Sequence, residues 1–222
     1  CAFEMFENVG LEMFLDRAQN RRTVLMFHGI GDASVTLEPD EEKYWITWDT
    51  FDSILNRYES YSPNDFYMTF DDGNASDLIA ARKMASRGLR GSFFVLLGRI
   101  GRAGYLSSQD IVEIKGLGME IGLHGRHHID WRSADDATLH SEITSALIEL
   151  SQICDTRVTS VAIPYGAYNR RVMTFLRAAD INQIYTSDRG QSRPNALVAR
   201  WDQVMCWQNM EDIEDIVGDR VP

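Results

Sequence analysis

Cysteine is scarce in this chain of 222 residues, and its three copies, Cys1, Cys154 and Cys206, lie far apart. An odd number of widely separated cysteines excludes a disulfide framework and the closely spaced cysteine pairs of zinc and redox motifs. We therefore interpret all three as free thiols.

Long hydrophobic runs are also missing from the sequence. No stretch reaches the roughly 18 apolar residues that a membrane-spanning helix needs. Residues 1–22 hold acidic side chains, Glu4, Glu7, Glu12 and Asp16, where a signal peptide would have a basic start and an apolar core. We expect a cytoplasmic protein without membrane insertion, and the lack of an initiating Met leaves a processed N-terminus open.

Positive charge is in short supply. The chain has 22 basic against 33 acidic residues, a formal net charge of −11, and its basic residues are scattered. Scattered cations offer no patch for nucleic acid or for an anionic membrane, so we expect neither as a partner. The length and the 44% apolar content suit a single domain that spans residues 1–222.

Apolar runs alternate with amphipathic segments along the chain. Buried parallel strands are predicted at 23–28, 66–70, 92–97, 119–123, 158–163 and 183–187. Helices are predicted at 74–88, at 108–115, over 139–153 behind two aspartates, and over 172–179 behind Asn169. This alternation predicts an α/β fold around a parallel sheet.

Three short polar segments follow predicted strands, at 69–73, 124–128 and 164–166. Four strand ends carry polar or turn residues, namely Phe27-His28, Phe70-Asp71, Leu123-His124 and Ile163-Pro164. Active sites of parallel α/β folds assemble at the carboxyl ends of their strands. The sequence therefore predicts one site to which all of these ends contribute.

Asp72, His124 and His128 form a candidate set of metal ligands. A catalytic zinc ion is typically held by three imidazole or carboxylate ligands, with one position left for water. The two histidines are four residues apart, so one helical turn or a tight helical loop would point both the same way. Metal coordination lowers the pKa of bound water from 15.7 to about 7, and the adjacent carboxylate of Asp71 would then accept its proton.

The turn at 164–166 offers a further group, the backbone amide of Tyr165, as a donor to a tetrahedral oxyanion. Each of these segments also has a simpler interpretation. An Asp-Asp-Gly sequence alone is more typical of a turn or of a helix start, and histidines can cluster on a surface by chance. The order and context of the three segments favour a metal-dependent hydrolase.

In that order, Thr-Phe-Asp-Asp-Gly, His-x-x-x-His and a strand ending in Pro-Tyr-Gly, the chain resembles the polysaccharide deacetylase family over roughly 23–200. The resemblance implies a distorted, incomplete (β/α) barrel of seven strands and a zinc or similar divalent metal. It implies an acetylated sugar as substrate and removal of N- or O-linked acetyl groups in bacterial glycan biosynthesis or modification.

The family roles carry over residue by residue. The resemblance implies Asp71 as catalytic base and Tyr165 as the donor of the oxyanion amide. His28, at the end of the first strand, is a candidate either for supporting the metal ligands or for proton transfer. The implied metal ligands are Asp72, His124 and His128. We expect the metal that they bind to be zinc.

The chain departs from the family pattern at three points. Ala162 stands where many members have an arginine that braces the catalytic aspartate, so we considered Arg193 and Arg200 as replacements. No histidine follows His140, which leaves the proton donor for the leaving group unassigned. Gly125 replaces the usual Ser or Thr after the first metal-binding histidine.

Two alternatives to the deacetylase stay open from the sequence. One is a deacetylase-like protein that binds glycan without turnover, and the other is a hydrolase of a small non-sugar amide. Trp131, three residues past His128, is the aromatic side chain that we expect near the cleft as a surface for a sugar ring.

Overall fold

The fold was obtained as a computed structural model that describes residues 22–33, 37, 41–190, 192–193, 196–200, 202–203, 208 and 210–218. The predictions for Cys1 and Cys206 lie outside these residues. The central feature is a sheet of eight parallel strands in the order β10-β1-β4-β5-β6-β7-β8-β9. Its strands are β1 (Thr23–Phe27), β4 (Phe66–Phe70), β5 (Gly91–Val95), β6 (Glu120–Leu123), β7 (Ser160–Ala162), β8 (Gln183–Thr186), β9 (Val198–Arg200) and β10 (Asp202–Gln203).

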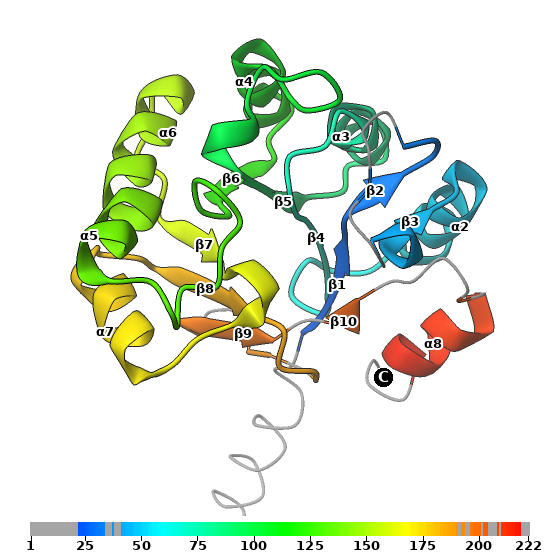
Figure 1. Cartoon of the computed structure of the whole chain (residues 1–222). Coiled ribbons are helices and arrows are strands. Elements are labelled where there is room, and N and C mark those ends of the chain that lie inside the picture. Colours follow the sequence, from blue (N-terminus) through cyan, green and yellow to red (C-terminus); the bar gives the residue numbers. More distant parts are fainter. Residues whose placement is uncertain are drawn as a thin grey trace, which may run out of the picture.

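The two edges of this sheet meet through neighbouring parts of the chain. β9 pairs with β8 at one edge and β10 pairs with β1 at the other, yet a single residue separates β9 from β10. Figure 1 shows the strands curling around a central axis with the helices outside them. The predicted distorted (β/α) barrel is confirmed, with seven strands of three to five residues and the two-residue β10 beside them.

Alternate residues of each strand face different cores. Val24 and Met26 of β1 belong to a small cluster with Phe94, Ala162, Tyr185 and Ala199 from other strands, which fills the inside of the barrel. Leu25 and Phe27 point the opposite way, into a larger core that also contains the inner faces of the helices. Burial on both faces explains why these strands read as continuous apolar runs in the sequence.

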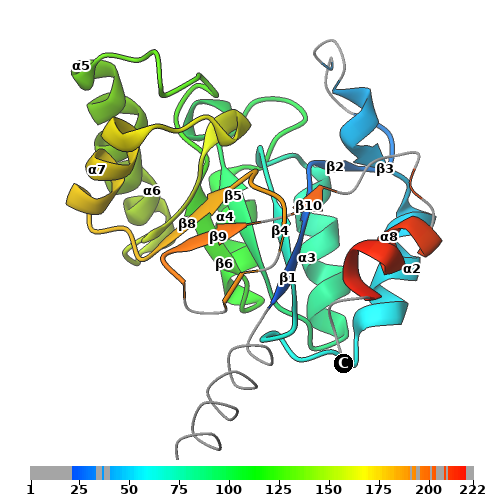
Figure 2. The same cartoon turned by 90° about the horizontal axis from the view of Figure 1, so that it is seen from below.

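The helices form an outer layer around the barrel (Figures 1 and 2). They are α2 (Trp48–Tyr58), α3 (Ser76–Ser86), α4 (Ser108–Gly116), α5 (Asp136–Leu139), the π-helix η3 (His140–Ser145), α6 (Ala146–Cys154), α7 (Arg170–Ala178) and α8 (Met210–Gly218). Ser107 and Asp110 cap α4 reciprocally, and Asn169, behind which a helix was predicted, caps α7. Within the residues described here, no helix is long and apolar enough to cross a membrane.

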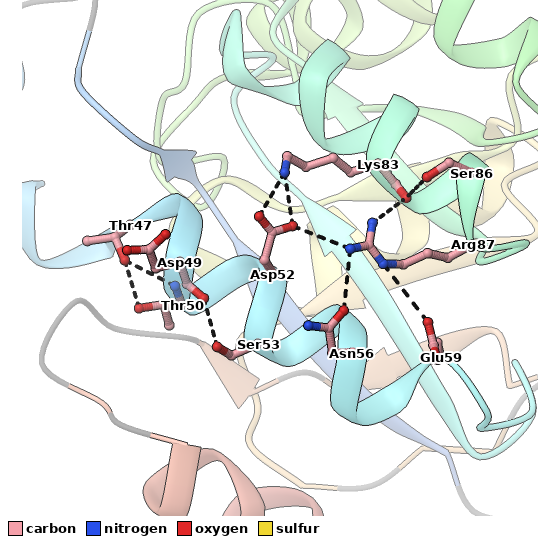
Figure 3. Close-up of polar contacts among 10 residues, drawn as sticks. All are labelled: Thr47, Asp49, Thr50, Asp52, Ser53, Asn56, Glu59, Lys83, Ser86 and Arg87. Carbon is pink, nitrogen blue, oxygen red and sulfur yellow. Dashed lines mark hydrogen bonds and ion pairs between the residues drawn. The ribbon is translucent and has the colours of Figure 1, made fainter.

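Helix α2 is attached to α3 by a polar network on the outer surface (Figure 3). Asp52 of α2 accepts two hydrogen bonds from Lys83, at 2.8 and 3.0 Å, and lies 3.7 Å from Arg87. Arg87 also contacts Asn56 and Glu59 of α2. These partly exposed pairs contribute little free energy each. The short strands β2 (Gly29–Ile30) and β3 (Trp45–Ile46) form a separate two-stranded sheet.

Candidate active site

The register of the sheet brings the polar strand ends together. Phe27 pairs with Phe70 in the β1–β4 ladder, and the amide of Asp71 donates to the carbonyl of Phe27 at 2.9 Å. His28 and Asp71 therefore follow adjacent strands at the same level. On the next strands, Val95 pairs with Leu123, so that His124 begins at the same end of the barrel.

The two adjacent aspartates reach one cleft because the chain turns sharply after β4. Asp72 has a φ of 79° and Gly73 has a φ of 70°, both in the left-handed region. Aspartate tolerates this conformation better than most residues, and a side chain in place of Gly73 would press on Val95, with a Cβ only 3.0 Å from its Cγ1. Both carboxylates are buried, with Asp71 1% and Asp72 2% exposed.

Asp72, His124 and His128 each present a ligand atom within 4.8 Å of the others. The Oδ1 atom of Asp72 lies 3.8 Å from His124 Nε2 and 3.9 Å from His128 Nε2. This buried oxygen has no hydrogen-bond partner in the described part of the chain. A buried carboxylate oxygen that has no hydrogen bond and faces two imidazole nitrogens fits a zinc-type divalent cation, whose usual donors are of these kinds.

The loop between the two histidines is not the helical turn that their spacing suggested. Residues 124–128 have no helical structure, and Gly125 and His128 have positive φ values of 95° and 52°. These two left-handed residues reverse the chain, so that both rings still converge, with their centroids 5.1 Å apart. The spacing therefore predicted the convergence correctly and its cause wrongly.

His124 is held in one orientation by the backbone of β7. Its Nδ1 atom lies 2.9 Å from the carbonyl oxygen of Ala162, which places the proton on Nδ1 and leaves the Nε2 lone pair for the cleft. Burial, assisted by the nearby His128, lowers the pKa of His124 to about 3. The ring is therefore neutral at physiological pH, the form that binds a metal.

Asp71 lies beside this set without a hydrogen bond to its Oδ1 atom. Its Oδ2 atom is 3.8 Å from His124 Nε2. Burial, with a further contribution from the charge of Asp72, raises the pKa of Asp71 well above its usual range, whereas imidazole neighbours and Arg99 lower the pKa of Asp72 despite its burial. Two adjacent carboxyls with pKa values shifted in opposite directions can divide the roles of base and ligand.

Neither Arg193 nor Arg200 braces Asp71 in the described residues. Both are exposed, and neither forms a hydrogen bond or an ion pair with Asp71. The arginine at the site is Arg99, whose Nη1 lies 3.6 Å from Asp72 Oδ1 and whose guanidinium stacks 5.0 Å from the ring centre of Tyr105. Arg99 contacts Asp72, a candidate metal ligand, and not Asp71. The sequence did not predict this contact, because Arg99 lies in a short turn after β5 that carries no motif.

Tyr165 forms the rim of the site from the turn after β7. It has a φ of 57°, and its ring lies 4.2 Å from the ring of His128. Its hydroxyl donates to the carbonyl of His128 at 3.2 Å, while 58% of the residue is exposed. The exposed aromatic face is therefore beside one candidate ligand.

His28 lies beside the candidate ligands on the β1 side of the site. Its ring stacks on Tyr44 with 4.8 Å between centroids. Burial lowers the pKa of His28, an effect that the charge of Asp72 opposes and that of His128 reinforces. His28 is thus a half-buried, neutral imidazole near all three candidate ligands.

Trp131 does not serve as an exposed surface for a sugar ring, because it is fully buried. Its Cζ2 atom would lie 3.2 Å from a Cβ at Gly125, so the indole packs beneath the histidine loop. Trp131 therefore lies near the site, as predicted, but its side chain is not exposed there. Trp201 and Trp207 lie outside the described residues.

Two buried acids near the site were not predicted from the sequence. Asp77 in the first turn of α3 is fully buried, and Glu142 in η3 is 2% exposed. The available signal for Glu142 was its place beside Ile143 in an apolar stripe, where a charged residue is unusual.

Comparison with known proteins gives a consistent result. The family model described as polysaccharide deacetylase matches residues 59–184, more than half of the chain. No curated protein matches the sequence. Among solved structures, the Streptococcus pyogenes deacetylase PplD in complex with acetate is 17% identical, with a TM-score of 0.77 over 89% of this chain and 98% of that one.

Two further structures share the same fold. IcaB from Ammonifex degensii is 19% identical, with a TM-score of 0.73 over 89% of this chain and 97% of that one. A polysaccharide deacetylase from Bacillus cereus is 16% identical, with a TM-score of 0.75 over 89% of this chain and 69% of that one.

Proposed function

The chain belongs to the polysaccharide deacetylase family, and on this basis we propose that it is a metal-dependent hydrolase that removes acetyl groups from a polysaccharide or oligosaccharide. One observation carries the proposal. Three ligand atoms of Asp72, His124 and His128 lie within 4.8 Å of one another, and the carboxylate of Asp71, whose Oδ1 atom has no hydrogen bond in the described residues, lies beside them.

We assign the metal to Asp72, His124 and His128, and we expect zinc because two imidazoles and one carboxylate are a common zinc donor set. When bound, such a metal polarises the acetyl carbonyl and lowers the pKa of water in the site. The positions of the three side chains are set by the sheet, by the turn at Asp72 and by the carbonyl of Ala162.

Asp71 is proposed to take the proton from the attacking water. Its raised pKa makes it a stronger base than an exposed carboxylate, and its Oδ1 atom makes no competing hydrogen bond. Its burial keeps bulk water away, so that the acquired proton stays available for the next step.

The backbone amide of Tyr165 is proposed to donate a hydrogen bond to the oxyanion that forms on the acetyl carbon. The left-handed conformation of Tyr165, within the turn that begins at Pro164, fixes the direction of this peptide group. The exposed ring of Tyr165 is then next to the sugar that carries the acetyl group, where an aromatic face contacts a pyranose well.

His28 is proposed to move a proton to the leaving group, because no histidine follows His140 in the sequence. A neutral imidazole with a lowered pKa can accept a proton and release it again within one catalytic cycle. Its stacking on Tyr44 keeps the ring at the mouth of the cleft.

The proposal is tested by two measurements on the purified chain. Elemental analysis after dialysis against trace zinc should find about one metal per chain, as the single ligand set requires. Acetate release should then be measured with an N-acetylated chitooligosaccharide and an O-acetylated xylan oligosaccharide, and ring opening should be measured with a small cyclic amide. Acetate from either sugar supports the proposal. Bound metal with turnover of the cyclic amide alone would replace it by an amidohydrolase, and absence of metal would leave a binding protein.

A further inference from the structure

Several peptide groups of the loop that joins His124 to His128 form hydrogen bonds with groups outside the loop. The carbonyls of Gly125 and Arg126 accept hydrogen bonds from the amides of Leu97 and Gly98, at 3.0 and 2.9 Å. These bonds tie one side of the loop to the turn that follows β5. The opposite side of the loop faces η3, where one carboxylate accepts hydrogen bonds from the loop amides.

That carboxylate belongs to Glu142. Its Oε2 atom accepts hydrogen bonds from the backbone amides of Arg126 at 2.8 Å and of His127 at 3.1 Å. Glu142 is 2% exposed, so a charged group has been buried to serve two main-chain donors between the two metal-ligand candidates. Burial of a carboxylate is costly, and charge-assisted hydrogen bonds to amides are the contacts that offset this cost.

The local structure of the helix places Glu142 there. Residues His140–Ser145 form a π-helix between α5 and α6, and this wider turn buries Glu142 and Ile143 side by side. Single π-turns inside α-helices are rare and are frequently found at functional sites. The insertion directs an acidic side chain inward from a helix whose other buried residues are apolar.

Gly125 leaves the room that this contact needs. A Cβ at position 125 would lie 3.0 Å from Glu142 Oε2, and the residue has a φ of 95°. The glycine that departs from the family's usual Ser or Thr is therefore matched to the buried glutamate. A larger residue would push the carboxylate away from the amides of the loop.

We infer that Glu142 is a positioning residue which holds the loop of His124 and His128 in its metal-binding shape before the metal arrives. The inference rests on the metal site of the proposed function and concerns no group that touches the substrate. Partners that orient metal ligands from behind typically change metal affinity by 10–100-fold when they are removed.

The test compares the zinc affinities of the wild type and of three variants, measured by competition with a chromophoric chelator. Glu142→Ala should raise the zinc dissociation constant by about 10–100-fold. Glu142→Asp should raise the dissociation constant to a similar extent, because the shorter aspartate keeps the negative charge but moves its carboxylate away from the two loop amides. Glu142→Gln, whose amide oxygen can accept from both amides, should stay within about threefold of the wild type.

Glu149→Ala is the matched control. Glu149 also contacts this loop, through an ion pair with the side chain of Arg126, but it is exposed and leaves the loop amides untouched. The zinc affinity of Glu149→Ala should stay within about twofold of that of the wild type, because an exposed ion pair contributes little.

Melting of the metal-free proteins separates positioning from general stability. A lower melting temperature of Glu142→Ala with unchanged zinc affinity would overturn the inference, as would wild-type affinity in Glu142→Asp or a loss in Glu142→Gln equal to that in Glu142→Ala. If the alanine variant does not fold, the aspartate and glutamine variants decide. Absence of zinc from the wild type would refute the proposed function itself. If the wild type binds zinc and the Glu142 variants bind it equally well, only the role of Glu142 is refuted.

Discussion

His124 Nδ1 lies 2.9 Å from the carbonyl oxygen of Ala162, so the main chain of β7 orients a ring carried by the end of β6. Ala162 is the position at which the family resemblance led us to expect an arginine brace. At this position the chain contributes a carbonyl to a metal-ligand candidate and no side chain to Asp71, the proposed base. The burial and the turn of Asp71 therefore have to fix its orientation.

Asp71→Asn should retain zinc and lose turnover. The substitution preserves the shape of the side chain but removes its ability to accept a proton from water, and removal of a general base typically costs about 10²–10⁴-fold in rate. Zinc content and acetate release should be measured on the same sample. Arg200→Ala, an exposed change away from Asp71, is the control and should keep the wild-type rate. Retained turnover in Asp71→Asn would show that another group is the base.

His128→Ala or Asp72→Ala should remove zinc and activity together. Each change leaves two of the three ligand atoms that now lie within 4.8 Å, too few for a stable catalytic zinc site. Elemental analysis after dialysis gives the metal content, and circular dichroism checks that the fold is retained. Full zinc occupancy in both variants would place the metal elsewhere.

His28→Gln should slow turnover without loss of zinc. His28 is outside the three-ligand set, and the loss of a proton-transfer group is expected to lower kcat by about 10²–10⁴-fold. A substrate with a better leaving group, such as an acetylated nitrophenol, should lose less rate than a sugar. Equal losses with both substrates would assign His28 to another role, and loss of zinc would make it a ligand.

Substitutions at Tyr165 should separate the backbone from the ring. Tyr165→Phe keeps the amide and the aromatic face and removes one partly exposed hydrogen bond to His128, so kcat should stay within about fivefold. Tyr165→Ala should raise KM for the sugar because the exposed face beside His128 is lost. Steady-state kinetics on acetylated oligosaccharides measures both values. A collapse of kcat in Tyr165→Phe would give the hydroxyl a chemical role.

The sequence predicted the strands and the position of the site because these depend on local patterns. Each of the six predicted strands is present, with ends shifted by at most two residues, since burial on both faces leaves an apolar run that is easily recognised. The closing strands β9 and β10 were missed because β10 consists of two polar residues and β9 ends in the exposed, charged Arg200.

The missed features of the site depend on contacts between distant segments. The shape of the 124–128 loop depends on positive φ values at Gly125 and His128, and residue spacing does not reveal them. Glu142 and Asp77 resemble solvent-facing acids in the sequence, and only the packing of η3 and α3 against the strand ends buries them.

Asp77→Asn should stabilise the metal-free protein at neutral pH. Asp77 is fully buried, and neither of its oxygens has a hydrogen bond of normal geometry in the described residues. Burial, with the charges of Asp72 and Asp71, raises its pKa well above the usual range, and the backbone of Asn74 opposes this only in part. The native state therefore either ionises a poorly solvated carboxyl or holds a proton that the unfolded chain releases.

The sign of the pH dependence follows from this shift. In the unfolded chain the carboxyl ionises near pH ~3.9. Because the folded-state pKa is higher, the stabilising contribution of Asp77 is complete below that pH and is lost as the pH rises through the folded-state pKa. Asparagine has no proton to lose, so the stability difference between Asp77→Asn and the wild type should be near zero at about pH 3.5 and grow to roughly 1–3 kcal/mol at neutral pH.

Denaturant unfolding at several pH values, with chelator present, measures this difference. Asp110→Asn is a control for the same chemical change in α4, where the carboxylate caps the helix and its removal should destabilise at neutral pH. A difference for Asp77→Asn that is constant across the pH range would mean that the folded-state pKa is ordinary. If the variant is more stable and also releases acetate more slowly, then Asp77 is retained at a cost in stability because its charge or its proton acts on the neighbouring Asp71.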